Sequence, residues 1–350
     1  MKQLLSKYNK ESALSLLSPI ETQRLRFIIG LVISFIISFG FNWPFAFITP
    51  VFVAKFLASN KPPPSLKTLL TIFIIISSAV FIGGMVTRVL LPYPVVFLLM
   101  MTLAIFWISY WNNSGGNEFV ITMLLICTTA IPMLGLIGNQ VPMIFTYGFL
   151  TSCFCALSIT FVMNTLIPAK GVIPSDTLTD TSELAPKHVR VKYALLSTLI
   201  IIPVITFFFS FNLTGAVLIM VFVAIMAQNI DLVVGVKGSK ALLVGNSIGG
   251  VVAIMVYALL ILVPSFSFLM LLMALVVCIF SQLIFSKHPL APIFSMALGT
   301  VIILVSSATL GNADADEKFY TRIFQIAAAC FYIIFTMIVA SPLIEKISKS

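Results

Sequence analysis

The sequence predicts an all-α polytopic membrane protein with about twelve transmembrane helices, arranged as two parallel six-helix repeats. Three observations carry this prediction: an apolar composition, an internal repeat and a one-sided distribution of basic residues. Sixty per cent of the 350 residues are hydrophobic and 9% are charged, whereas ordinary soluble domains carry about 25% charged residues. Many of the charge-poor runs reach the ~20 residues that a helix needs to cross a bilayer.

The internal repeat joins two segments that lie 170 residues apart. Residues 41–54 return as residues 211–224, with seven of 14 positions identical, including the Phe-Asn start and the Val-Phe-Val-Ala end. A second pair of similar segments, 65–70 and 238–243, follows in the same order. Periodicity of this kind indicates one structural unit present twice in the chain.

Apolar runs separated by polar breaks predict six spans in each half. Residues 1–24 form a cytoplasmic amphipathic segment on the membrane surface. The first repeat covers 25–168, a cytoplasmic linker covers 169–192, and the second repeat covers 193–345. The predicted spans are 25–41, 44–59, 67–91, 94–111, 118–138 and 142–167, then 193–211, 213–230, 240–263, 266–286, 290–311 and 321–344.

The basic residues set the predicted orientation, because cytoplasmic loops of membrane proteins are enriched in Lys and Arg. With both termini in the cytoplasm, 17 of the 20 Lys and Arg residues fall on the cytoplasmic side. Only Arg88, Lys318 and Arg322 fall on the other side. Six spans per half then give the two halves the same orientation, as parallel repeats have.

The segment from 27 to 59 must cross the membrane twice, which leaves about 16 residues, or roughly 24 Å, per crossing. Either Arg24 and Arg26 extend to the headgroups and the first span starts earlier, or the turn at Asn42, Trp43 and Pro44 lies below the outer surface. In the second case Asn42 and Asn212 flank a polar cavity, because irregular backbone at membrane depth must be surrounded by protein or water. In the alternative, the turn is an ordinary interfacial one with Trp43 in the aromatic belt.

Four further charged residues are candidates for function. Arg88 ends the third span and either attracts an anion or extends to the outer headgroups. Arg322 follows an acidic outer loop, which either contacts a partner or is solvated. Glu118 and Asp231 are carboxylates at inner helix ends; each is a candidate proton acceptor in a coupled cycle or, alternatively, an exposed helix end such as the dipole favours at Glu118.

Several function classes find no support in the sequence. It contains no nucleophile–base pair, no metal-ligand cluster and no phosphate loop, so we expect no enzyme, no cofactor and no metal site. The five cysteines all fall in apolar runs, where they are interpreted as small buried residues. The basic residues lie between spans rather than on one face, which argues against nucleic-acid binding.

Five local motifs carry a resemblance to a known family: Arg24-x-Arg26, Asn42-Trp43, Thr49-Pro50, Lys61-Pro62-Pro63-Pro64 and Gly83-Gly84. With them the chain resembles the fusaric acid resistance (FUSC)/aromatic acid exporter superfamily, closest to its compact branch without large cytoplasmic domains. The resemblance implies a bacterial inner-membrane efflux permease driven by the proton gradient. It also implies a periplasmic adaptor of the membrane-fusion type and, through it, an outer-membrane channel. Plant malate channels have a similar design, in which two six-span units enclose an anion path.

The resemblance, applied by position in the fold, implies that substrate meets Asn42, Trp43, Arg88, Asn212 and Arg322. The expected partners are small organic anions and membrane lipid, and a homo-oligomer is left open. Three functions remain in competition: an exporter of small amphipathic or aromatic organic acids, a passive organic-anion channel, and a non-transporting anchor subunit. The lack of a deep intramembrane charge pair weakens the coupled exporter, since carriers keep ionisable residues along their route.

Overall fold

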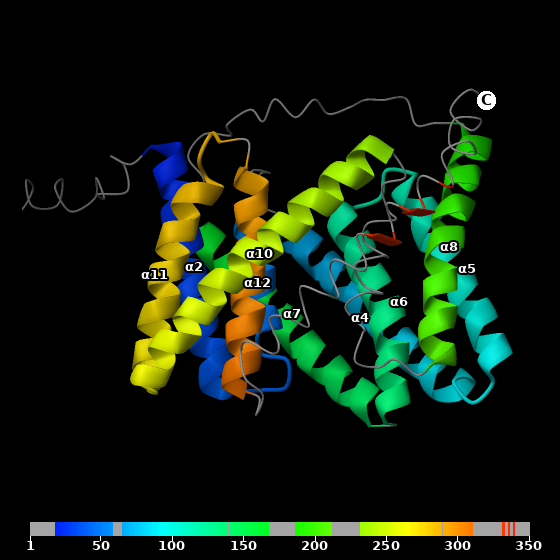
Figure 1. Ribbon diagram of the computed structural model, residues 1–350, viewed down its shortest axis with the longest axis horizontal. Helices are drawn as coiled ribbons and strands as arrows, with labels where there is room; N and C mark the ends of the chain where they lie inside the picture. The colour runs from blue at the N-terminus through cyan, green and yellow to red at the C-terminus, as the bar shows by residue number, and fades with distance from the viewer. Residues whose placement is uncertain are drawn as a thin grey trace, which may run out of the picture.

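The computed structural model describes residues 18–58, 65–138, 140–167, 186–211, 232–288, 290–310 and the five residues 331, 332, 335, 336 and 339. Nearly all of this part of the chain is α-helical (Figure 1). Its helices are α2 (Pro19–Phe41), α3 (Ile48–Ala58), α4 (Leu66–Leu90), α5 (Pro94–Asn112), α6 (Glu118–Ile137), α7 (Val141–Leu166), α8 (Lys187–Ser210), α10 (Leu232–Leu262), α11 (Phe266–Ile284) and α12 (Ala291–Leu310).

Eight helices in the described part of the chain are long and apolar enough to cross a membrane. Two further apolar helices are shorter, at Ile48–Ala58 and Ala291–Ser306. The predicted all-helical membrane architecture is therefore confirmed. The predicted span 213–230 and most of the span 321–344 lie outside the described residues, so the count of twelve stays a prediction.

Helix α2 begins six residues before the predicted boundary at 25, because the sequence supplies a helix start there. The side chain of Ser18 accepts a hydrogen bond from the backbone N–H of Glu21, and the carboxylate of Glu21 accepts one from the backbone N–H of Ser18. Such a capping box satisfies amide groups that the first helical turn leaves open. Proline at position 19 suits the first turn, where no amide partner is needed.

Helix α3 is shorter than the span predicted at 44–59, so that prediction was wrong in length. Its 11 residues extend only about 16 Å, half of the ~30 Å hydrocarbon core. The residues that precede it form an irregular turn instead of a helix, with positive φ angles of 46° at Asn42 and 60° at Phe45. The segment from α2 to α3 is thus a full crossing followed by a short return.

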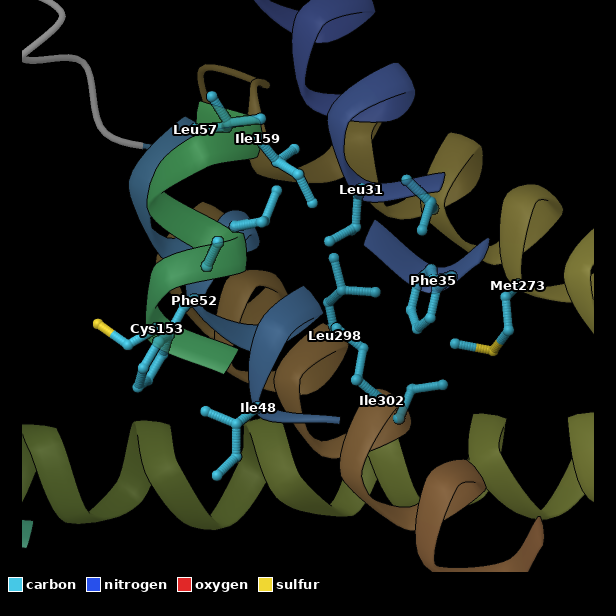
Figure 2. Close-up of a cluster of buried hydrophobic side chains, with 14 of the residues drawn as sticks. Leu31, Phe35, Ile48, Phe52, Leu57, Cys153, Ile159, Met273, Leu298 and Ile302 are labelled. Carbon is cyan, nitrogen blue, oxygen red and sulfur yellow. The ribbon is translucent and has the colours of Figure 1, made fainter. Parts of the chain in front are cut away.

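The largest hydrophobic core joins α2, α3 and α7 of the first half to α11 and α12 of the second. Figure 2 shows Leu31 and Phe35 of α2 lying next to Leu298 and Ile302 of α12, with Met273 of α11 beside Phe35. A second core lies between α5, α6 and α8. Helix α6 contributes side chains to both cores, which makes it the wall that they share.

The two halves contact each other in a reciprocal pattern. Helix α2 packs on α11, and α8 packs on α5. In the predicted repeat α8 corresponds to α2 and α11 to α5, so the same pair of elements meets twice with the halves exchanged. Figure 1 shows the α2–α11 pair on the left and the α8–α5 pair on the right. Exchange of this kind is the signature of a two-fold, isologous interface.

An arginine joins the first helix of each half to the other half. The guanidinium of Arg24 in α2 donates a hydrogen bond to the carbonyl of Phe285, at the end of α11, over 3.4 Å. The guanidinium of Arg190 in α8 donates one to Ser114 Oγ, just past α5, over 3.2 Å, and lies 6.0 Å from the ring centre of Tyr110. Both cations sit where the negative end of a helix dipole attracts positive charge.

Helices α10 and α12 pack through small residues. A Cβ atom on Gly249 would collide with the carbonyl oxygen of Ala297, and one on Gly245 would lie 3.0 Å from the carbonyl oxygen of Ile293. Two glycines four residues apart allow this close backbone approach. Helix α10 begins at Leu232 rather than at the predicted residue 240, and its 31 residues, about 46 Å, cross the molecule obliquely (Figure 1).

Candidate functional site

The first two predicted site residues, Asn42 and Trp43, serve the turn before α3. Asn42 is exposed and adopts the left-handed conformation that ends α2, where its backbone N–H donates to the carbonyl of Ser38. Asparagine tolerates this conformation better than most residues do. The indole Nε1 of Trp43 donates a 2.9 Å hydrogen bond to Ser152 Oγ of α7. The single polar atom of the Trp43 side chain is therefore already used within the protein.

The same turn lies directly against α7. Ser152 Oγ donates onward to the carbonyl of Phe45 over 3.3 Å, and the ring of Phe45 packs edge-on against Phe145 at 5.1 Å between centroids. The carbonyl of Pro44 sits where a Cβ atom of Gly148 would be. This irregular backbone is thus covered by protein on its α7 side, as irregular backbone in a membrane must be.

The third predicted residue, Arg88, lines a cavity between α4, α6 and α7, which we call the Arg88 cavity. Its volume is about 400 Å³, within the ~300–1,000 Å³ range of small-molecule pockets. Neither Asn42 nor Trp43 lines it. The lining residues are Val80, Phe81, Gly84, Met85, Thr87, Arg88, Leu91, Pro92, Gly135, Pro142, Met143, Thr146, Tyr147 and Leu150.

A second cavity of about 660 Å³ adjoins the first and shares Arg88, Pro92, Met143 and Tyr147 with it. We call it the outer cavity, because it is completed by Gln140 and Ile144, at the end of α7 that the predicted topology puts outside. Arg88 thus lines both cavities, at the place where they adjoin. Such a boundary suits a ligand with one charged end.

The electrostatics of both cavities favour an anion. Arg88 is the one charged side chain among their lining residues, and no carboxylate is present among them. Arg88 is exposed and lies in the last turn of α4, where a cation also complements the helix dipole. A ligand carboxylate would gain a charge-assisted hydrogen bond there without competition from a protein acid.

The two hydroxyl groups deeper in the Arg88 cavity are already committed to their own helices. Thr87 Oγ1 donates to the carbonyl of Gly83 over 2.7 Å, and Thr146 Oγ1 donates to the carbonyl of Pro142 over 2.8 Å. Their protons are therefore not available to a ligand. The inner part of the chamber acts as an apolar surface, which suits a ring or an alkyl group rather than a sugar.

Two glycines shape the chamber in different ways. A Cβ atom on Gly135 of α6 would lie 2.8 Å from the methyl carbon of Thr87, so glycine is needed for the close approach of α6 to α4. A Cβ atom on Gly84 would meet only Thr146 Oγ1, at 3.7 Å. Gly84 therefore leaves empty space that a larger residue would fill.

The side chains of the other four predicted site residues lie outside the described part of the structure. Asn212, Asp231 and Arg322 lie outside the described residues. Glu118 is the first residue of α6, but its side chain is also outside the described part of the structure. The predicted roles of these four residues, in substrate binding and proton coupling, stay predictions.

Sequence reasoning did not find the α7 side of the cavity. Thr146, Tyr147 and Leu150 carry no motif, and only the packing of α7 against α4 brings them to Arg88. The two glycines of the Gly83-Gly84 pair have different surroundings. A Cβ atom on Gly83 would contact Ile131 of α6 at 3.6 Å, whereas Gly84 lines the cavity.

Comparison with known proteins gives one match. Residues 23–167 match the model of a family described as "Protein of unknown function (DUF2955)". This stretch includes every residue that lines the two cavities. The match does not confirm the resemblance to the FUSC/aromatic acid exporter superfamily, which stays a prediction. No curated protein and no solved structure matches the chain.

Proposed function

We propose that this protein is an inner-membrane efflux permease, not an enzyme, that exports small amphipathic or aromatic organic acids. The observation that carries the proposal is the Arg88 cavity: one cation at the mouth of an apolar chamber between membrane-spanning helices. A carboxylate fits the guanidinium, and a ring fits the chamber beside it. The termini are cytoplasmic in this proposal, as the distribution of basic residues predicts.

Coupling and partners belong to the same proposal and rest on the sequence. Glu118 and Asp231 would take up protons from the inner side, and a periplasmic adaptor would pass substrate on to an outer-membrane channel. One observation favours a second candidate, a passive organic-anion channel. Among the residues that line the two cavities there is no acid to link anion movement to proton movement.

A flux assay separates these candidates. The purified full-length chain is reconstituted in proteoliposomes, and movement of radiolabelled benzoate is followed with and without an imposed pH gradient. Uphill movement that requires the gradient supports the exporter, and downhill movement that ignores it supports the channel. Absence of flux in both conditions contradicts both. Glu118→Gln with Asp231→Asn should abolish uphill movement and leave downhill movement in an exporter.

Arg88→Gln tests the site itself. A hydrogen bond to a charged group is worth about 1.5–3 kcal/mol, so flux at low substrate should fall by about tenfold or more. Lys67→Gln is the matched control, because this substitution removes the same charge from an exposed side chain at the other end of the same helix. Equal flux in both variants would remove Arg88 from the transport route.

A further inference from the structure

We infer that the Arg88 cavity opens sideways into the bilayer and takes a single-tailed amphipathic carboxylate that has first partitioned into the lipid. The acid group lies at Arg88, and the apolar part lies along α4 and α7. This inference rests on the anion site of the proposed function. It adds the route of access and narrows the substrate class to acids with a lipophilic tail.

The mouth of the cavity is formed by large apolar side chains that the protein leaves uncovered. Phe81 and Met85 of α4 are 59% and 51% exposed, and Met143 and Tyr147 of α7 are 52% and 63% exposed. All four line the cavity. In a helix of spanning length, exposed apolar side chains face hydrocarbon, because water would exclude them. Helix α4 also has the lowest buried share of the eight span-length helices.

The position of Arg88 sets the depth of the ligand. It lies in the last turn of α4, next to the turn that follows Leu90, so its guanidinium reaches the headgroup level while its stem lies in the apolar layer. Phe81 precedes Arg88 by seven residues in α4, which places it about 10 Å closer to the membrane centre. A carboxylate at Arg88 therefore directs its tail past Met85 and Gly84, which is the way that a lipid-dissolved acid is oriented.

The size of the chamber argues for one tail. About 400 Å³ is near the lower end of the range for small-molecule pockets, and it is too small to enclose both chains of a phospholipid. The hydroxyl protons of Thr87 and Thr146 are bound to their own helices, so these two groups do not donate to the tail.

The corresponding positions in α10, in the described part of the second half, do not carry the two residues on which this site depends. When residues 65–70 are aligned with 238–243, Gly84 corresponds to Tyr257 and Arg88 to Ile261, both in α10. A tyrosine replaces the glycine that leaves space, and an isoleucine replaces the cation. We therefore expect one ligand per chain.

Photo-crosslinking tests the inference without any need for transport. The full-length protein in liposomes is irradiated with a benzoate that carries an octyl chain with a terminal diazirine, and the labelled peptides are mapped. Labels should fall within 80–91 and 142–150. Unlabelled 4-octylbenzoate should compete, whereas benzoate should compete far more weakly, because each buried methylene tightens binding about fourfold. Phosphatidylglycerol should not compete.

Two variants with matched controls complete the test. Gly84→Leu fills the chamber and should reduce labelling at least tenfold, whereas Gly40→Leu adds the same bulk to α2 where no atom lies within 4 Å and should change nothing. Arg88→Gln should reduce labelling similarly, and Lys67→Gln should not. Arg88→Gln adds no bulk, so it decides the matter if Gly84→Leu fails to fold.

Four outcomes overturn the inference. They are labels outside the cavity, labelling unchanged in Arg88→Gln, equal competition by benzoate, and equal competition by phosphatidylglycerol, which would indicate a lipid site. Flux of benzoate with labels elsewhere would contradict this inference alone. Absence of flux of both benzoate and 4-octylbenzoate, with labels in the cavity, would contradict the permease alone.

Discussion

Gly148 is the point at which the turn before α3 touches α7 most closely. The carbonyl of Pro44 occupies the space that a side chain at Gly148 would need. The hydrogen bonds from Trp43 to Ser152 and from Ser152 to the Phe45 carbonyl hold the turn in that place. The position tolerates glycine alone because backbone, and not a movable side chain, stands in the way.

We expect Gly148→Ala to lower the free energy of unfolding by about 1–3 kcal/mol, the usual cost of forcing extra volume into a packed contact. Thermal unfolding of the purified protein in detergent measures this. Gly40→Ala is the control, since nothing lies within 4 Å of the added methyl group and alanine is the better helix former. If both variants melt alike, the turn does not lie against α7 as described.

At the residue scale, the sequence singles out Arg88 as a candidate but not its neighbours in the cavity. A lone cation at the outer end of an apolar helix stands out in any sequence, and Arg88 does line a cavity. Tyr147 and Thr146 look like any other residues of an apolar run. Their role comes from the rotation of α7 about its axis relative to α4, which a hydropathy pattern does not encode.

At the scale of helices, boundaries were predicted best where proline or a polar cap ends the apolar run. The spans predicted at 67–91 and 266–286 are observed at Leu66–Leu90 and Phe266–Ile284. Helix α3 begins at Ile48 instead of 44, because Phe45 and Phe47 are apolar but belong to a turn that packs on α7. Hydropathy reports how strongly a side chain prefers an apolar environment, and it says nothing of the backbone conformation.

Two other helices begin earlier than predicted, because their first few turns contain basic residues. Helix α8 begins at Lys187, inside the predicted linker 169–192, and α10 begins at Leu232, before Lys237 and Lys240. In both cases the helix continues beyond the hydrocarbon layer, where basic residues are no longer excluded. The sequence predicts the apolar stretch of a helix, while the hydrogen-bonded helix extends further.

The two arginine contacts between the halves make a prediction at this scale. Arg24→Gln and Arg190→Gln each remove a cation from a helix end, and each should cost about 0.3–2 kcal/mol of unfolding free energy. Helices α2 and α8 stand on opposite sides of the molecule (Figure 1), so the two effects should add in the double variant.

Thermal unfolding of the two single variants and of the double variant measures these costs. Lys187→Gln is the control, because Lys187 is exposed at the first turn of α8, where a cation opposes the dipole. Unchanged stability in both single variants would mean that the arginines do not hold the halves together.

For the whole molecule, the reciprocal pairing of α2 with α11 and of α8 with α5 goes with the predicted parallel orientation of the repeats. We expect the turns at Tyr93 and Ser265 to lie outside, and those at Ser114 and Lys287 inside. Single cysteines at these four positions, in a chain whose native cysteines are replaced, are treated with a membrane-impermeant maleimide. The first two should react in intact cells, and the last two only after permeabilisation. Opposite results at Tyr93 and Ser265 would show antiparallel halves.

The exchange of first helices between the halves has a consequence for how such a chain can arise. A single six-helix unit contains both members of the pair, an α2 and an α5. Two identical units could therefore form a dimer in which the α2 of each unit packs on the α5 of the other. Fusion of two copies of the gene would keep both of these helix contacts and would allow the two copies to change independently. One copy could then keep the arginine and the glycine that leaves space beside it, while the other copy acquired an isoleucine and a tyrosine at these positions. A symmetric dimer would in this way give rise to an asymmetric single chain.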